Sequence, residues 1–510
     1  MGTRRSLHLQ GGGSPRRAHT MLRVALRLSL FSALTLTSCS TDLHDHDGLL
    51  QKIRPTIGDS SVFDGYGDEP ALFVDSDDGR VRVWYVENGP HRTSSLDENP
   101  ADGIPDFVQT VADTADAVYI SITDDGFLAP LEDTSVSGQD NDGGSSAFDI
   151  YIVDFQRADG LFFREGCLPG EPVRCTGYFA IKNGFGRSGY ASDEEAITVL
   201  VSHEYFHAVQ AAYNADLPGW WSEGTATWHE EYFEPSQNDF ERLATTFFEA
   251  PGRALNGNTQ GTTDTFAYGT GVFPFFLEQT LGVQVIVDIF DRIAINTPVE
   301  AAIMEAVEAS APFDETFAEF TAWTIATGDR TIEGFGYPQA AEFPAIDATS
   351  LDGTRDLNWD TELRTWASQI AEIERPRDIS LSVRPLEGWP LTPLLVVVDP
   401  TTPGEWAVVR EGEILNIPAN GQPVYAALLN ADPDERTAGR LAIRGATINT
   451  PDEPGDGSTE SPAEVELIPL PSADDSSGCS SVLGSGSRGM MVWSGVLAVL
   501  LRRRRKLAGS

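Results

Sequence analysis

One short stretch constrains this chain more than any other: His203-Glu204-Tyr205-Phe206-His207. Residues four apart lie one turn from each other on the same face of an α-helix, so a helix here directs both imidazoles toward one point. Two neutral imidazole nitrogens at this separation suit Zn²⁺, which favours nitrogen and sulfur ligands. Glu204 lies beside them, close enough to take a proton from a metal-bound water. The stretch therefore predicts a helix that carries two ligands of a zinc site.

A catalytic zinc site needs a third protein ligand and one open position. Glu223, in the segment WWSEGTA that follows the histidine pair, is the candidate for that ligand. Glu230 is its rival, because it lies seven residues further along the same predicted helix and on roughly the same face. Histidine makes up only 8 of the 510 residues, so chance rarely produces such a pair in a chain of this composition. The plainer alternative is two histidines on a solvated helix face or satisfied within the core.

The run HEYFHAVQ, followed by WWSEGTATW, resembles the gluzincin branch of the zincin metalloproteases and is most similar to the peptidase MA-like secreted proteins. The resemblance is specific over residues 192–230 and extends over about residues 60–340. It implies a zincin-like fold with His203, His207 and Glu223 as zinc ligands and Glu204 as general base. Many thermolysin-like members carry a carboxylate four residues after the third ligand, where this chain has Thr227. The residue that orients a zinc-bound imidazole is therefore unassigned.

Length and charge limit the remaining possibilities. A chain of 510 residues predicts two folded domains plus tails. It contains 35 Lys and Arg against 77 Asp and Glu, a net charge of −42. Such a surface does not hold nucleic acid phosphates, and it favours solubility and an extracytoplasmic location.

The first 39 residues have the layout of a signal peptide. A charged segment, residues 21–27, precedes an apolar segment, residues 28–36. The apolar segment ends in Leu36-Thr37-Ser38-Cys39, which resembles a bacterial lipobox and makes Cys39 the lipidation candidate. An ordinary signal peptide cleaved nearby is the alternative. Residues 40–61 are polar and predict a tether.

A loop with alternating acidic residues predicts a calcium site within the first folded domain, residues 62–345. Its candidate ligands are Asp97, Asn99, Asp102 and Asp106, with Gly103 at the turn. Ca²⁺ prefers carboxylate and carbonyl oxygens at such positions, although the spacing differs from an EF-hand. The alternative is an acidic turn that caps a helix predicted for residues 107–120, since carboxylates are favourable at helix N-termini.

Two cysteines lie inside the predicted domain, whereas Cys39 and Cys479 belong to the terminal segments. Cys167 and Cys175 bracket a short loop that holds two prolines. In an exported protein such a pair predicts a disulfide. A zinc site is the weaker alternative, because two thiolates alone make an incomplete one.

The segments around the zinc helix have their own signals. Residues 177–182 predict a strand, and the zincin resemblance implies that it edges the cleft and pairs with extended substrate, with an interior strand as the alternative. Ser192 and Glu195 fit the capping box that begins a helix. Tyr268 is a candidate hydrogen-bond donor to the oxyanion, with a buried structural tyrosine as the alternative. Five later segments have helical periodicity and match the helical subdomain expected of a zincin: 239–249, 271–281, 285–295, 299–309 and 314–327.

From about residue 346 the chain changes character. Short strands punctuated by Pro, Gly and Asp predict a small β-sandwich-like domain over residues 346–448. Residues 449–478 form an acidic Ser/Pro stalk. Residues 479–510 contain Cys479, an apolar run of 12 residues and an arginine cluster. That run is shorter than the roughly 20 residues of a membrane-spanning helix, and the layout resembles the C-terminal sorting signals of myxobacterial surface proteins.

These observations lead to one expectation: an α+β zincin-like metallopeptidase domain followed by a small all-β sandwich-like domain. The expected activity is zinc-dependent endopeptidase hydrolysis of a protein or peptide substrate, with Ca²⁺ as a second candidate cofactor. The expected location is extracytoplasmic, on a bacterial outer membrane or cell surface or released from it, with membrane contact through the termini. The alternatives are a non-catalytic surface binding or adhesion protein on a peptidase-like fold, and a zinc hydrolase of a non-peptide bond.

Overall fold

The computed structural model describes residues 54–445 apart from 61, 137–142, 156–157, 187, 258–263 and 402–404, together with the short strands Ala463–Val465 and Ile468–Pro469. The chain divides into two units, residues 1–36 and 37–510, and all described residues belong to the second. The predicted signal peptide, the lipidation candidate Cys39, most of the stalk and the C-terminal sorting segment lie outside the described residues.

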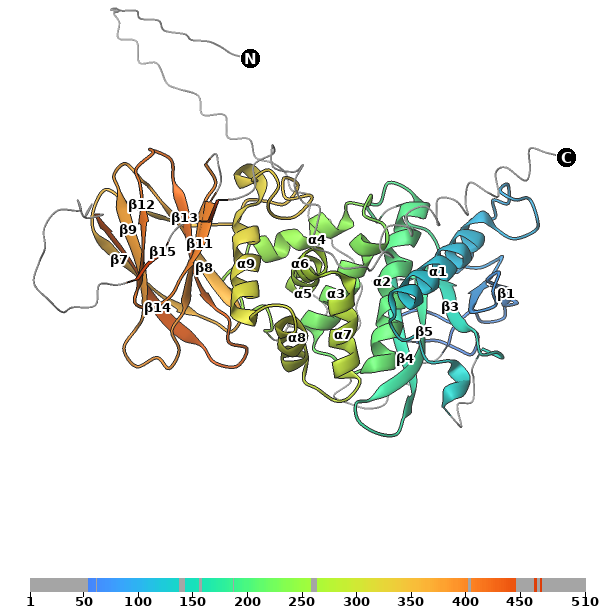
Figure 1. Ribbon diagram of the computed structural model, residues 1–510. Coiled ribbons are helices and arrows are strands. Elements are labelled where there is room, and N and C mark those ends of the chain that lie inside the picture. Colours follow the sequence, from blue (N-terminus) through green and yellow to red (C-terminus); the bar gives the residue numbers. More distant parts are fainter. Residues whose placement is uncertain are drawn as a thin grey trace, which may run out of the picture. The chain divides into compact units, whose positions relative to one another are not determined.

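The first sheet has five strands in the order β1-β2-β3-β5-β4 (Figure 1). Strands β2, β3 and β5 run parallel, whereas β1 and β4 are antiparallel to their neighbours and form the two edges. Helices α1 (Asp106–Asp125) and α2 (Asp193–Tyr213) pack on one face of this sheet. The strands are β1 (Leu72–Asp75), β2 (Val81–Tyr85), β3 (Phe148–Val153), β4 (Gly160–Leu168) and β5 (Arg174–Lys182). Burial on both faces explains why β3 is almost continuously apolar.

The other face of the sheet is covered by the segment that precedes β1. Arg54 is buried there, 1% exposed, with three carboxylates around its guanidinium. Its Nη2 lies 2.6 Å from Asp133 Oδ2 and 2.5 Å from Glu165 Oε2, and Asp149 pairs with Nη1. The described residues 54–60 therefore belong to the folded domain, and the tether prediction is wrong for them. Composition suggests a solvated tail here, but a buried charge with three partners is a tertiary feature.

Breaking this cluster is expected to be costly. Replacing Arg54 with Met leaves three buried carboxylates without their cation, which lowers the free energy of unfolding by about 3–5 kcal/mol. Burial raises the pKa of Asp133, and the neighbouring Arg54 opposes this shift. Denaturant unfolding measures the loss, and Arg92→Met, at an exposed arginine, is the control. Equal stability of the two variants would contradict this role for Arg54.

A group of helices follows α2. The helical segments predicted between residues 239 and 327 are confirmed, each within a few residues. The first of them pack against α3 (Gly219–Phe233), which follows directly after the turn at the end of α2, and the later ones pack against one another. The remaining helices are α4 (Asp239–Phe248), α5 (Phe266–Gly269), α6 (Val272–Leu281), α7 (Val283–Ile293), α8 (Val299–Glu308) and α9 (Phe313–Ile325), with 3₁₀ turns η1 (Asp133–Ser135) and η3 (Gly328–Arg330). Among the described residues no single helix has the length and apolarity to cross a membrane, although α5–α6 and α7 pass that test as a pair bent by 119°.

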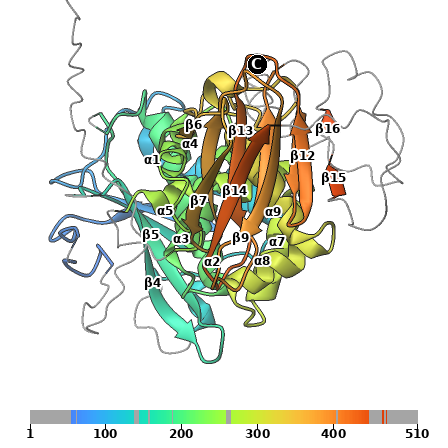
Figure 2. The same cartoon turned by 90° about the vertical axis from the view of Figure 1, so that its left-hand side faces the viewer.

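The C-terminal strands form two sheets packed face to face (Figure 2). One sheet has the order β16-β11-β10-β13-β8-β6 and the other β15-β12-β9-β14-β7. The expected all-β region is confirmed, and β15 and β16, within the segment predicted to be a stalk, extend the two sheets. The strands are β6 (Thr349–Leu351), β7 (Leu357–Leu363), β8 (Ala367–Ile373), β9 (Ile379–Pro385), β10 (Leu394–Asp399), β11 (Glu405–Val409), β12 (Glu413–Ile417), β13 (Val424–Asn430), β14 (Thr437–Gly445), β15 (Ala463–Val465) and β16 (Ile468–Pro469).

The helices and the six-stranded sheet share one hydrophobic core. Val396, Val398 and Leu429 of that sheet belong to the same buried cluster as the aromatic residues of α9. The opposite face of the sheet packs against its partner sheet. This double burial explains why β13 has no exposed residue.

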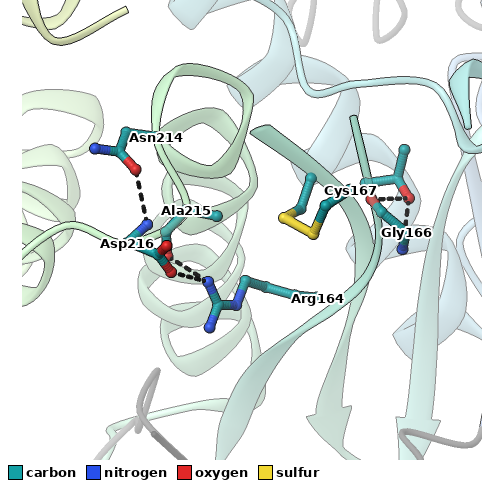
Figure 3. Close-up of a disulfide and its surroundings, with 8 residues drawn as sticks. Arg164, Gly166, Cys167, Asn214, Ala215 and Asp216 are labelled. Atoms are coloured by element: carbon teal, nitrogen blue, oxygen red, sulfur yellow. Dashed lines mark hydrogen bonds and ion pairs between the residues drawn. A yellow bond between two sulfur atoms is a disulfide. The ribbon is translucent and has the colours of Figure 1, made fainter. Parts of the chain in front are cut away.

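The hairpin of β4 and β5 holds the turn between α2 and α3 (Figure 3). Cys167 and Cys175 form a disulfide across this hairpin, as predicted. Arg164 donates to the carbonyl oxygen of Ala215 at 2.8 Å and pairs with Asp216 at 2.6 Å. Arg174 donates to the carbonyl oxygen of Ala212 at 2.6 Å. The hairpin therefore fixes the connection between the two helices that carry the predicted ligands.

Removing the disulfide is expected to loosen this connection. The double variant Cys167→Ser/Cys175→Ser should lose about 2–3 kcal/mol of unfolding free energy, the amount typical of a cross-link that closes a short loop. Denaturant unfolding gives the loss, and hydrogen exchange should show faster opening at residues 212–216. Reduced wild-type protein is the control. Free thiols at both Cys167 and Cys175 in the denatured, unreduced ectodomain, which lacks Cys39 and Cys479, would contradict the disulfide itself.

Candidate metal centre

Helix α2 brings the histidine pair into the core. Ser192 Oγ accepts from Glu195 N at 3.1 Å, and Glu195 Oε2 accepts from Ala191 N at 3.1 Å. This confirms the predicted capping box, which satisfies amides at the start of the helix. From Ala196 to Tyr213 nearly every residue of α2 is buried. A polar group inside a core needs partners. The contacts of the buried polar residues of α2 therefore indicate which of them could bind a metal ion and which orient the others.

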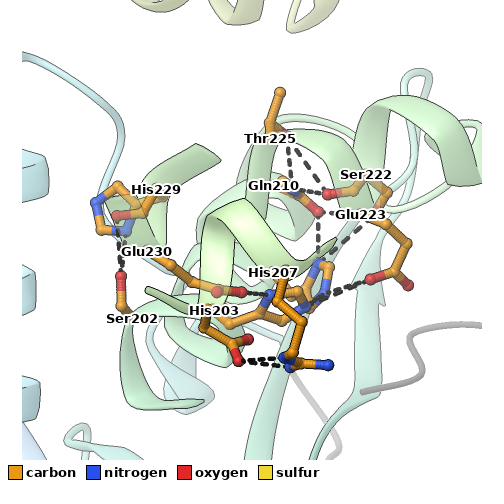
Figure 4. A network of polar contacts seen from close by, with 11 residues as sticks. Ser202, His203, His207, Gln210, Ser222, Glu223, Thr225, His229 and Glu230 are labelled. Atoms are coloured by element: carbon orange, nitrogen blue, oxygen red, sulfur yellow. Dashed lines mark hydrogen bonds and ion pairs between the residues drawn. The ribbon is translucent and has the colours of Figure 1, made fainter. Parts of the chain in front are cut away.

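Three candidate ligand atoms converge between α2 and α3 (Figure 4). His203 Nε2 and His207 Nε2 lie 3.0 Å apart, and Glu223 Oε2 lies 3.4 Å from the first and 3.6 Å from the second. Ligand bonds of about 2.0–2.1 Å in a tetrahedral arrangement place donor atoms roughly 3.3 Å apart. Over the described part of the chain, this is the only group of three or more His, Cys, Asp or Glu residues whose ligand atoms lie this close together. The donor set and its spacing fit Zn²⁺.

The electrostatics of the group favour a cation at its centre. Burial alone would raise the pKa of Glu223, but its contacts with His203 and His207 outweigh burial and hold that pKa well below its usual value. Burial alone would lower the pKa of His203, but Glu223 and Glu230 outweigh it and raise that pKa well above the ordinary value. The buried cluster therefore attracts positive charge, which a bound proton or a metal ion supplies.

Glu230 orients His203 and does not join the ligand group. Its Oε1 lies 2.5 Å from His203 Nδ1, on the side of the ring away from Nε2. A carboxylate at Nδ1 keeps the proton on that nitrogen and leaves the lone pair of Nε2 facing the centre. Glu230 therefore occupies the role that Thr227 leaves unfilled, one helical turn later, and the structure does not place it as the rival third ligand.

Gln210, which the sequence motifs did not single out, orients His207 in the same way. Gln210 Oε1 accepts from His207 Nδ1 at 2.8 Å, while Gln210 Nε2 donates to the carbonyl oxygen of Ser222 at 2.7 Å and to Thr225 Oγ1 at 2.9 Å. Ser222 Oγ donates to Gln210 Oε1 at 2.8 Å. The sequence does contain a cue to this role, because Gln210 follows His207 by three residues on the same helix face.

A further pair sets the register of α2 against α3. Ser202 Oγ lies 2.8 Å from His229 Nδ1 and 3.2 Å from the carbonyl oxygen of His229. Burial lowers the pKa of His229 to about 3, so its ring is neutral. Ser202 precedes His203 and His229 precedes Glu230, so this contact lines up the ligand with the carboxylate that orients it.

Comparison with known proteins adds nothing to this geometry. No protein-family model matches the chain, and no curated protein sequence matches it. The chemistry of the site is therefore inferred from its own residues.

Glu204 lies beside the ligands, fully buried, against the start of strand β4. A Cβ added at Gly160 would lie 2.9 Å from Glu204 Oε1 and 3.0 Å from its Cγ. Glycine at this position therefore leaves the space that the carboxylate occupies. Strand β4 is also the edge of the sheet, whereas β5 lies between β3 and β4. The expectation that residues 177–182 edge the cleft is wrong, and the interior alternative is correct, because the antiparallel hairpin places β4 outside β5.

Tyr268 lies next to His203. The two ring centroids are 5.9 Å apart with planes inclined by 24°. Close packing of α5 against α3 holds it there: a Cβ added at Gly224 would lie 2.4 Å from Thr270 Oγ1, and Thr270 Oγ1 donates to the carbonyl oxygen of Trp220 at 2.5 Å. The structure thus brings this predicted residue to the metal centre.

The candidate calcium loop uses its carboxylates on its own backbone. Asp97 accepts from the amides of Asp102 at 3.0 Å and Gly103 at 2.9 Å. Asp106, the first residue of α1, accepts from the amides of Glu98 at 3.1 Å and Asn99 at 3.0 Å. These contacts match the acidic-turn alternative. Binding of Ca²⁺ by Asp97, Asn99, Asp102 and Asp106 stays a prediction.

Proposed function

We propose that this chain is a zinc-dependent metallopeptidase with a zincin-like catalytic domain. The observation that carries the proposal is the convergence of His203, His207 and Glu223, with Glu204 buried beside them. If His203 and His207 simply lay on a solvated helix face or were satisfied within the core, nothing would require a third carboxylate at ligand distance. Nor would each ring need a hydrogen-bonding partner at its Nδ1. An extracytoplasmic location accords with the Cys167–Cys175 disulfide.

Each residue has a distinct role in the proposed reaction. A Zn²⁺ ion held by His203, His207 and Glu223 would supply Lewis-acid chemistry, which polarises a carbonyl group and acidifies water. Glu204 would accept the proton of the attacking water and pass it to the leaving amine. Tyr268, whose ring packs beside His203, would donate a hydrogen bond to the developing oxyanion. Glu230 and Gln210 would hold the two imidazoles in the tautomer that binds metal.

The edge of β4 that pairs with no described strand is the proposed place for substrate. Among the described strands, β4 pairs with β5 on one side only, and Gly160 at its start lies against Glu204. An extended peptide that adds to this edge would bring its backbone to the catalytic carboxylate.

The experiment that tests the proposal is metal analysis of the purified chain together with digestion of a peptide library. We expect about one zinc per chain and new peptide N-termini that disappear with a chelator and return with zinc. Stoichiometric zinc without any cleavage would favour the binding-protein alternative. Cleavage of ester or amide compounds but not of peptides would favour a zinc hydrolase of another bond.

A variant of Gly160 tests whether β4 positions the general base. Gly160→Ala should reduce kcat roughly 10- to 100-fold, because small misplacements of a catalytic group have effects of this size, while zinc content stays unchanged. Gly184→Ala is the matched control, since a Cβ there meets nothing within 4 Å. Unchanged kcat in Gly160→Ala would contradict this role of β4, because it would show that the Glu204 carboxylate adjusts without loss of activity.

A further inference from the structure

A second polar site lies where the helical region meets the β-sandwich. A cavity of about 350 Å³ is lined by three arginines, Arg253, Arg364 and Arg436, with Gln369 and Glu362. The arginines come from three separate segments: the stretch after α4, the β7–β8 turn and the residue before β14. We call this cavity the arginine pocket. It lies outside the metal centre, and none of its lining residues belongs to that site.

The concentration of arginine is unusual for this chain, which has 35 basic residues against 77 acidic ones. Arg253 pairs with Asp264 through both terminal nitrogens, at 2.9 and 2.8 Å, and Arg436 pairs with Glu362 at 3.2 Å. Arg364 is exposed and has no ion pair or side-chain hydrogen bond with any residue that the structure describes. The lining therefore has three cations and one anion, with one guanidinium available for a ligand.

Two of the segments that line the pocket pack closely against each other. A Cβ added at Gly252 would lie 2.2 Å from Gln369 Nε2, so glycine makes room for this amide. Backbone bonds tie the same loop to the sheet, since Leu255 N donates to the carbonyl oxygen of Trp366 at 3.1 Å. The guanidinium of Arg253 lies 3.9 Å from the centroid of the Phe266 ring. Arg253 is therefore held in place, and a donor that is already held loses little entropy when it binds a ligand.

We propose that the arginine pocket binds a phosphate or sulfate group. A guanidinium presents a planar fork of donors that matches an oxyanion in bidentate geometry. Arg364 offers such a fork. The Gln369 amide and the guanidiniums of Arg253 and Arg436, each of which also pairs with a carboxylate, line the same cavity. This set suits a tetrahedral oxyanion with several acceptor oxygens. The cavity is larger than the oxyanion itself, which leaves room for part of the molecule that bears the group. The proposal does not depend on peptidase activity.

Calorimetric titration of the full, zinc-loaded chain with inorganic phosphate tests this site, with sodium chloride at matched ionic strength as the reference. We expect saturable binding of one phosphate per chain, and sulfate should bind the same site with equal or lower affinity. Arg364→Gln should weaken the affinity roughly 10- to 100-fold, the effect of losing a hydrogen bond to a charged group.

Arg384→Gln is the matched control, because Arg384 is an exposed arginine of the same β-sandwich outside the pocket. It should leave phosphate affinity unchanged. Titration with a phosphomonoester of glycerol and with phosphatidic acid vesicles then separates a small soluble ligand from a lipid headgroup. Absence of saturable phosphate binding, or binding that Arg364→Gln leaves intact, would overturn the proposal; the second result would place the anion elsewhere, including at the zinc.

Discussion

Replacing Glu204 with glutamine is expected to reduce peptide hydrolysis by at least about 10²–10⁴-fold while zinc content stays the same. Glutamine keeps the shape of the side chain but removes the basicity that proton transfer requires. Glu204 is not one of the three residues whose ligand atoms converge, and its carboxylate lies against Gly160. The measurement is kcat on one cleaved peptide, with zinc per chain determined on the same sample.

Glu231→Gln is the control for this experiment. Glu231 is a buried glutamate of α3 whose Oε1 accepts from Gln339 Nε2 at 2.9 Å, so it has a structural partner and no place in the proposed mechanism. It should leave kcat close to the wild-type value. A fully active Glu204→Gln variant would end the proposed peptidase mechanism, whatever the metal content.

Replacing Glu223 with alanine is expected to abolish stoichiometric zinc binding, and activity with it. His203 and His207 alone form an incomplete site, and the carboxylate that balances them is removed from a buried position. Glu230→Gln should instead keep zinc but bind it roughly 10- to 100-fold more weakly, as is typical when a residue that orients a ligand is lost. Competition with a chromogenic chelator measures both affinities.

The two glutamates approach different nitrogens of His203. Glu223 Oε2 lies 3.4 Å from His203 Nε2, whereas Glu230 Oε1 lies 2.5 Å from His203 Nδ1. If Glu230→Gln strips the zinc and Glu223→Ala retains it, the third ligand has been assigned to the wrong residue.

The elements that the sequence predicts well are those with strong periodicity. The apolar spacing of residues 285–295 predicts α7, whose face Val285, Ile289 and Ile293 is buried. Ser192 and Glu195 predict the start of α2, because the capping box is a local interaction. The ligand group is predictable for the same reason: His203 and His207 share one helix face, and Glu223 lies on the next helix.

What the sequence does not reveal depends on tertiary contacts. A buried Arg54 has no local signal, because its three carboxylates lie 79 to 111 residues away. The position of β4 outside β5 follows from hairpin topology, which strand propensity does not encode. The role of Glu230 depends on the angle between α2 and α3, which the contact between Ser202 and His229 sets. The sequence shows that Glu230 lies on the right helix face, and only the packing shows which nitrogen it approaches.

The most direct test of the central claim is an anomalous-difference map from crystals of the zinc-loaded chain, recorded at the zinc absorption edge. We predict one strong peak about 2.0–2.2 Å from His203 Nε2, His207 Nε2 and a Glu223 carboxylate oxygen, with Glu230 on the far side of the His203 ring. A zinc peak coordinated by Glu230, or no peak between α2 and α3, would contradict it.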